Sequence, residues 1–234
     1  MQSVRFLKEK HKGKITKDFQ RDLKRLKAGE PLDYVIGFVS FLGCKIDLSQ
    51  KPLIPRPETE FWAEKALKEV KGRCLDMFSG SGCIGLAVLK NTKASVDFAD
   101  NDKKCLKQIR INLKQNNLKG SVICSDVFSN IAGKYDYIFA NPPYISYKRK
   151  SKVQKSVLKY EPHNALFSKD NGMEIIKRFL AELPYHLKEN GVAYMEFDPV
   201  QKREIAKLIK GTFEKDQYGK FRYVVLRKNY CTIK

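Results

Sequence analysis

One short motif in this sequence of 234 residues combines residue types that could activate a planar nitrogen. It consists of Asn141, Pro142, Pro143 and Tyr144, directly after the apolar run 137–140. An amide or aromatic amine nitrogen is a poor nucleophile because its lone pair is delocalised, but two acceptors for its N–H bonds would orient it. The Asn141 side-chain carbonyl and the Pro142 main-chain carbonyl could be those acceptors, while Tyr144 offers a flat face. Positioning would then supply most of the rate. The alternative is a Pro-Pro turn capped by asparagine.

A glycine-rich turn at residues 78–82 is a second candidate site. It lies between a predicted strand and a predicted helix, whose first N–H groups are free to bind a ligand. Gly80 and Gly82 let the backbone approach that ligand closely. A tight turn that binds nothing is the alternative.

Two carboxylates follow the next two predicted strands. Asp100 ends the first of them and is placed to accept hydrogen bonds from ribose hydroxyls. Asp100 or Asp102 could instead cap the following helix, and we favour the ribose role for Asp100 and the cap for Asp102. Asp126 could accept from an adenine amino group while Val127 lines the ring, or it could be a solvated loop carboxylate.

The elements that must position these residues alternate along the chain from residue 73. Short apolar runs alternate with helical patterns, which is typical of βαβ units on a parallel sheet. The predicted strands cover residues 74–78, 95–99, 121–124, 135–140, 192–197, 212–217 and 221–227. Two predicted helices end near residues 90 and 112, and two more cover residues 172–187 and 200–209. The last two strands are close enough in the chain to pair antiparallel.

The front of the chain has a different pattern. Apolar residues at helical spacing, beginning at Ile15, predict one or two short basic helices. Residues 38–48 predict a β-hairpin, and prolines then forbid regular structure until a helix begins near Glu58.

The charge is strongly basic, with 46 Lys and Arg against 26 Asp and Glu, or +20 overall. Such a field attracts a polyanion or a partner bound to one, although a lysine-rich proteome produces the same excess. Residues 148–159 hold six basic residues and no acidic one, shortly after the Asn-Pro-Pro-Tyr motif. We expect this stretch to meet the macromolecule that carries the substrate. A solvated flexible loop is the alternative.

Several features bear on location and metals. No apolar run approaches the ~20 residues that span a bilayer, and residues 1–27 lack the apolar stretch of a secretory signal. The six cysteines form no C-x-x-C pair, which predicts reduced, buried thiols, and the three histidines are far apart. We therefore expect a cytoplasmic protein without a metal site and without membrane contact.

The sequence resembles the release-factor glutamine methyltransferases, which methylate N5 of the glutamine in the Gly-Gly-Gln tripeptide of peptide-chain release factors. The similar segments are 29–37 (GEPLDYVIG), 53–60 (LIPRPETE), 141–145 (NPPYI) and 160–167 (YEPHNALF). The resemblance runs from about residue 29 to residue 226. Adenine-N6 methyltransferases share the NPPY loop, whereas the proline-rich signature at 53–60 is more specific.

The resemblance implies a Rossmann-like α/β fold with a seven-stranded, mostly parallel methyltransferase sheet and an antiparallel edge. A short basic helical segment (1–28) and a β-hairpin linker with the proline-rich signature (29–57) would precede a methyltransferase domain (58–234). The implied cofactor is S-adenosylmethionine, and the implied partner is a release factor, with nucleic acid as the alternative. The sequence leaves the oligomeric state open.

The resemblance also implies roles for individual residues. The cofactor would be bound by Phe78, Ser79, Gly80, Ser81, Gly82, Asp100, Asp126, Val127 and Asn141. The substrate glutamine would be held by Asn141, Pro142, Pro143 and Tyr144, with Asn141, Pro142 and Tyr144 as the catalytic residues. The proline-rich segment either packs near the site or only begins a helix, so the roles of Arg56 and Glu58 stay open.

Three departures from the family pattern matter. Phe78 replaces the usual first glycine of the loop, and residues 197–199 replace a glycine-containing turn. About 28 residues precede Gly29, where the family has a larger helical domain that contacts the release factor. The alternative activity is adenine-N6 methylation of rRNA, tRNA or DNA. An RNA-binding protein without activity is disfavoured because the glycine-rich turn and the NPPY loop are both intact.

Overall fold

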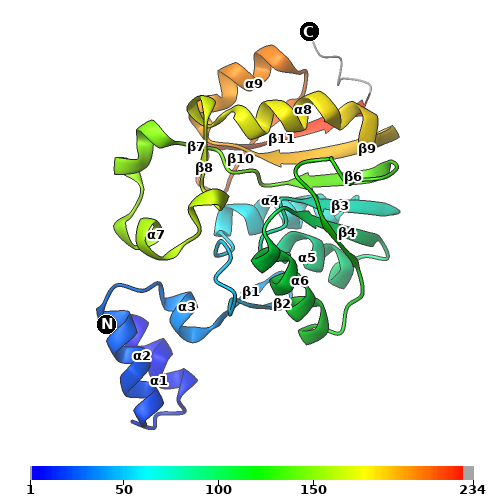
Figure 1. The fold of residues 1–234 in the computed structure, drawn as a ribbon. Helices are drawn as coiled ribbons and strands as arrows, with labels where there is room; N and C mark the ends of the chain where they lie inside the picture. Colours follow the sequence, from blue (N-terminus) through cyan, green and yellow to red (C-terminus); the bar gives the residue numbers. More distant parts are fainter. Residues whose placement is uncertain (1, 229–234) are drawn as a thin grey trace.

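A seven-stranded sheet forms the centre of the computed structural model, which describes residues 2–228 (Figure 1). Across the sheet the strands are β10 (Thr212–Lys215), β11 (Phe221–Arg227), β9 (Leu187–Glu196), β6 (Tyr135–Ala140), β3 (Arg73–Met77), β4 (Ser95–Asp100) and β5 (Ser121–Cys124). The last five of these run parallel, whereas β10 and β11 form an antiparallel edge. The predicted Rossmann-like sheet is therefore confirmed.

Helices cover both faces of the sheet, as in doubly wound folds. Successive strand residues point to opposite faces, so Cys74 packs in one apolar core and Leu75 in the other. The first core includes side chains of α4 (Pro57–Leu67), α5 (Cys83–Asn91) and α6 (Lys103–Gln115). The second includes side chains of α8 (Glu174–His186) and α9 (Lys202–Leu208).

The N-terminal helices form a small unit at one end of the molecule (Figure 1). They are α1 (Gln2–Lys10), α2 (Lys17–Lys27) and α3 (Leu32–Ile36), and their buried contacts are Leu7, Phe19 and Val35. The hairpin of β1 (Phe38–Phe41) and β2 (Cys44–Asp47) follows as predicted. Ile15 was expected on a helix, but it is exposed because Thr16 caps α2 and the helix begins after it. The domain boundaries at 28 and 57 stay a prediction.

Between β6 and α8 lie short elements that the sequence pattern did not predict. β7 (Ile145–Ser146) pairs in parallel with β8 (Phe167–Ser168). The basic stretch 148–159 folds into a 3₁₀ helix (Tyr147–Lys152) and α7 (Lys155–Tyr160) in place of a flexible loop. Such elements are too short to leave a periodic pattern. Further 3₁₀ turns in this region are His163–Ala165 and Asp170–Gly172, and another, Pro199–Gln201, follows β9.

Two further features follow from the described residues. Four of the five described cysteines are buried free thiols, but Cys124 is exposed, against expectation, because it ends β5 at the rim of the sheet. Cys231 lies outside the described residues. Within residues 2–228, no helix is long and apolar enough to cross a bilayer.

Candidate active site

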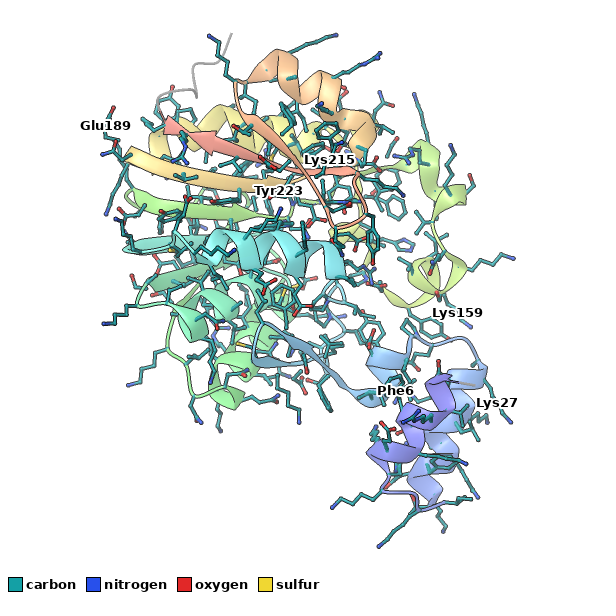
Figure 2. The ribbon with its side chains drawn as sticks, turned by 180° about the vertical axis from the view of Figure 1, so that it is seen from behind. Phe6, Lys27, Lys159, Glu189, Lys215 and Tyr223 are labelled. Carbon is teal, nitrogen blue, oxygen red and sulfur yellow. The ribbon has the colours of Figure 1, made fainter. Side chains whose placement is uncertain are left out.

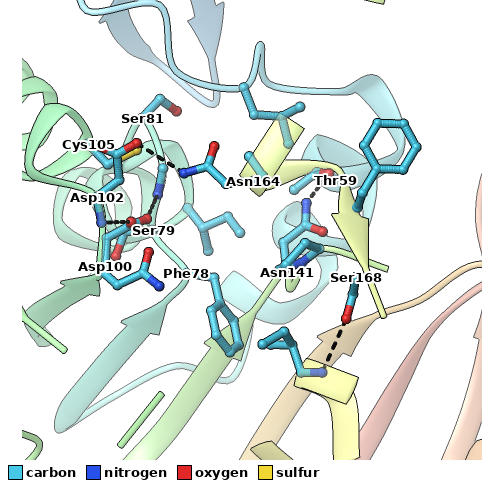
Figure 3. Close-up of a pocket in the computed structure, with 18 of the residues that line it drawn as sticks. Thr59, Phe78, Ser79, Ser81, Asp100, Asp102, Cys105, Asn141, Asn164 and Ser168 are labelled. Carbon is cyan, nitrogen blue, oxygen red and sulfur yellow. Dashed lines mark hydrogen bonds between the residues drawn. The ribbon is translucent and has the colours of Figure 1, made fainter. Parts of the chain in front are cut away.

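A cavity of about 300 Å³ opens at the carboxyl ends of β3, β4 and β6. In doubly wound sheets ligands bind at this end, where neighbouring connections leave in opposite directions. Figure 3 shows Phe78, Ser79 and Asp100 on one side of the cavity and Asn141 with Thr59 on the other. The predicted site residues that line it are Phe78, Ser79, Gly80, Ser81, Asp100, Asp126, Asn141 and Pro143, together with Arg56.

The glycine-rich turn is held by its own hydrogen bonds. The Ser79 hydroxyl donates to the carbonyl oxygen of Asp76 and accepts from the N–H of Ala99. Phe78 has φ = 58°, in the left-handed region, which costs a non-glycine residue about 1–2 kcal/mol. This conformation explains physically why glycine is usual at this position. The Phe78 ring packs against Phe179, with the ring centres 5.9 Å apart, and this contact offsets part of the strain.

Asp100 faces the cavity from the end of β4. One carboxylate oxygen accepts from the N–H of Gly80 at 2.8 Å and the other from the N–H of Asp102 at 2.9 Å. Burial raises the pKa of Asp100, while these two hydrogen bonds act in the opposite direction. Asp102 caps α6 by accepting from the N–H of Lys104, which confirms the helix cap that we assigned to Asp102. The ribose role of Asp100 stays a prediction.

The segment after β5 is arranged differently from the expectation. Asp126 lines the cavity, but both of its carboxylate oxygens accept from Arg178, at 2.8 and 3.2 Å. Val127 is only 2% exposed and packs in the second core, so its side chain is not among the residues that line the cavity. Its φ of 51° is strained for a β-branched residue.

The NPPY loop, residues 141–144, is anchored at both ends. The Asn141 side-chain nitrogen lies 3.4 Å from the hydroxyl oxygen of Thr59. The Tyr144 hydroxyl donates to Glu196 at 2.9 Å, and the Tyr144 carbonyl accepts from the Gln201 side chain at 2.9 Å. Side-chain hydrogen bonds therefore hold both ends of the loop. Pro142 is buried and, like Gly82, does not line the first cavity.

A second cavity of about 450 Å³ adjoins the first at Asn141. Leu53 and Arg56 also line both cavities, and Tyr144 lines the second. Its other walls come from Ile145 after the NPPY loop, from the basic stretch (Arg149, Lys152, Val153, Gln154 and Val157), from Ala165 and Leu166 before β8, and from Asp198 after β9. Ala165 also lines the first cavity. A ligand entering here would reach Asn141 without passing through the first cavity.

The basic stretch 148–159 thus contributes to a wall of the second cavity. Arg149 forms an ion pair with Asp198. At its far end the Tyr160 hydroxyl donates to the carbonyl oxygen of Ala28 at 2.9 Å, so α7 abuts the end of α2. Lys27 and Lys159 accordingly lie on the same side of the molecule (Figure 2).

The proline-rich signature packs directly against the site. Arg56 forms an ion pair with the buried Glu161 at 2.7 Å, and Glu161 also accepts from the N–H of Ile54 at 3.1 Å. Two segments about a hundred residues apart are thereby joined. Glu58, left open above, lines neither cavity.

Two residues near Asn141 were missed by sequence reasoning. Thr59 lies in the proline-rich signature at 53–60, but nothing in that sequence indicates a role for its hydroxyl. Glu196 sits in an apolar strand and is 1% exposed. The only sequence feature that could have indicated a role for Glu196 is that it is an acidic residue in a strand predicted to be buried. Among residues 2–228 we find no group of three or more His, Cys, Asp or Glu side chains that could hold a metal ion.

Comparison with known proteins identifies the class. A family model described as the methyltransferase small domain matches residues 57–168. A solved methyltransferase from Pyrococcus furiosus has the same fold, with a TM-score of 0.60 at 18% identity, covering 91% of this chain and 99% of that one. The fold, with its glycine-rich turn and NPPY loop, defines a doubly wound α/β methyltransferase.

Two curated relatives identify the family. The release factor glutamine methyltransferase of Streptococcus pneumoniae is 37% identical over 222 residues, or 90% of this chain and 80% of the relative. The protein of the same name from Lactococcus lactis subsp. lactis is 32% identical, over 87% of this chain and 80% of the relative. This chain belongs to the release factor glutamine methyltransferase family.

Proposed function

We propose that this protein transfers a methyl group from S-adenosylmethionine to N5 of the glutamine in the Gly-Gly-Gln motif of a peptide-chain release factor. The names of the relatives support the substrate. The observation that carries the proposal is the position of Asn141, whose side chain lines both cavities. A methyl donor in the first cavity and an amide from the second would meet at Asn141.

The residues of the first cavity fit this cofactor. Each carboxylate oxygen of Asp100 accepts one backbone N–H, and its remaining lone pairs can accept from ribose hydroxyls. The acidic residues of the lining, Asp100, Asp102, Asp126 and Glu174, outnumber the basic ones, Arg56 and Lys169, and this excess of negative charge favours a cationic ligand. Bound S-adenosylmethionine supplies an activated methyl group on a sulfonium centre.

The chain itself would contribute orientation. The side-chain oxygen of Asn141 would accept one N–H of the glutamine amide, and the main-chain carbonyl of Pro142 the other. With both N–H bonds held, the nitrogen presents its face to the first cavity, which lowers the entropy cost of reaching the transition state. The nitrogen becomes acidic once the N–C bond has formed, and its proton leaves to solvent. No general base is needed.

The relatives do not favour adenine-N6 methylation, although the NPPY loop and the charge of +20 are compatible with it. The discriminating experiment supplies methyl-labelled S-adenosylmethionine with either purified release factor or total RNA. We expect the label in the release factor. Label in the RNA alone would overturn the proposal.

A further inference from the structure

We propose that Thr59 and Glu196 act as a positioning pair, fixing the Asn141 amide so that its oxygen faces the substrate. The proposal rests on the proposed function, because it concerns how the same site holds its amide. The two residues lie 137 positions apart, on α4 and β9. The Thr59 hydroxyl donates to Glu196, and the two residues contact Asn141 and Tyr144 of the NPPY loop, respectively.

Glu196 is the centre of the arrangement. It is 1% exposed, and three side chains donate to it: the Thr59 hydroxyl at 2.7 Å, the Trp62 ring N–H at 2.9 Å and the Tyr144 hydroxyl at 2.9 Å. A buried carboxylate needs such partners, since an unpaired one would be strongly destabilising. Trp62 can only donate, so the carboxylate must act as an acceptor on that side.

The direction of these hydrogen bonds determines the orientation of Asn141. Because the Thr59 hydroxyl gives its proton to Glu196, its oxygen can only accept from the Asn141 side chain. The side chain must therefore turn its NH₂ group toward Thr59, at 3.4 Å. Its carbonyl oxygen is left for an incoming N–H. An asparagine with the opposite orientation would offer a donor where the substrate needs an acceptor.

The same carboxylate also holds Tyr144, so one buried group positions both ends of the NPPY loop. The proline-rich signature therefore has a role beyond beginning helix α4. Because the Thr59 hydroxyl donates its proton to Glu196, the Thr59 oxygen is left to accept from the NH₂ group of Asn141.

The test compares Thr59→Val with Thr59→Ser in the full chain. Valine keeps the shape but removes the hydroxyl, so we expect kcat for release factor methylation to fall about 10- to 100-fold. Thr59 also lines the first cavity, but valine keeps its shape there, so the Kd for S-adenosylmethionine should stay within about two-fold while kcat falls. Serine keeps the hydroxyl and should restore most of the rate. Thr59→Ala, which cannot overpack, should behave like valine if the valine variant fails to fold.

A second readout does not depend on the substrate. The side-chain NH₂ signals of Asn141, assigned in NMR spectra by their loss in Asn141→Ala, should shift or broaden in Thr59→Val and remain as in the wild type in Thr59→Ser. An unchanged signal and unchanged kcat in Thr59→Val would overturn the positioning role, and so would equal impairment of the serine variant. A wild-type enzyme that does not label release factor would instead overturn the proposed function, and the NMR comparison would still decide the role of Thr59.

Discussion

Replacing Asp100 with alanine is expected to weaken cofactor binding specifically. The carboxylate lies at the end of β4 and lines the first cavity. In the free protein it accepts from the N–H groups of Gly80 and Asp102. Alanine removes these acceptors, so the glycine-rich turn loses one of its anchors. It also removes the acceptor that we assign to the ribose.

The expected magnitude follows from the number of lost interactions. A hydrogen bond to a charged group contributes about 1.5–3 kcal/mol, whereas desolvation of this buried carboxylate partly offsets that gain. We therefore expect a net loss of about 1–3 kcal/mol in cofactor binding, or about 5- to 150-fold in Kd.

Isothermal titration calorimetry with S-adenosylmethionine measures this loss directly. Asp97→Ala is the matched control, because Asp97 lies on the same strand but pairs with Arg73 and does not line the cavity. We expect the control to bind the cofactor within about two-fold of the wild type. If Asp100→Ala binds as tightly as the control, the ribose assignment is wrong.

Three other variants test separate parts of the account. Asn141→Ala should abolish turnover while cofactor affinity, measured by calorimetry, stays within a few-fold; an undiminished single-turnover rate would remove Asn141 from the mechanism. Glu30→Gln should destabilise the protein by about 1–3 kcal/mol at pH 7 in urea unfolding, because the Arg25 guanidinium lowers the pKa of Glu30 to about 2. This stabilisation is full above pH 4.5 and is lost as the pH falls toward 2, so a difference that does not shrink with acid would contradict it. In the basic stretch, serine replaces Lys148, Arg149, Lys150 and Lys152. The variant should methylate release factor more slowly at low salt, with little change in kcat. If it methylates release factor at the wild-type rate at every salt concentration, the basic stretch plays no part in binding the substrate.

The sheet could be predicted because its signals are long and repeated. Five apolar runs alternate with helical patterns, and tertiary packing then pairs each run with a neighbour. The pairing of β7 with β8 could not be predicted, since two residues carry no period. Strand β9 begins at Leu187 rather than at residue 192 because Leu187 pairs with Tyr135 across an irregular register, a contact that sequence spacing does not reveal.

The candidate site was predictable only where a motif marks it. The turn at 78–82 and the NPPY loop carry glycines and prolines whose backbone roles can be inferred from residue type. Thr59 and Glu196 carry no such mark, because their roles depend on elements 137 positions apart meeting in the fold. Val127 shows the converse: it is itself a predicted cofactor-binding residue, yet its side chain packs in the core.

The central claim is that Asn141 presents a release factor glutamine to the methyl donor. Tandem mass spectrometry of release factor incubated with the enzyme and S-adenosylmethionine tests it most directly. We predict the added mass of one methyl group on the side-chain amide of the Gly-Gly-Gln glutamine with the wild type, and none with Asn141→Ala. A methyl group on another release factor residue, or an equal yield from Asn141→Ala, would contradict the claim.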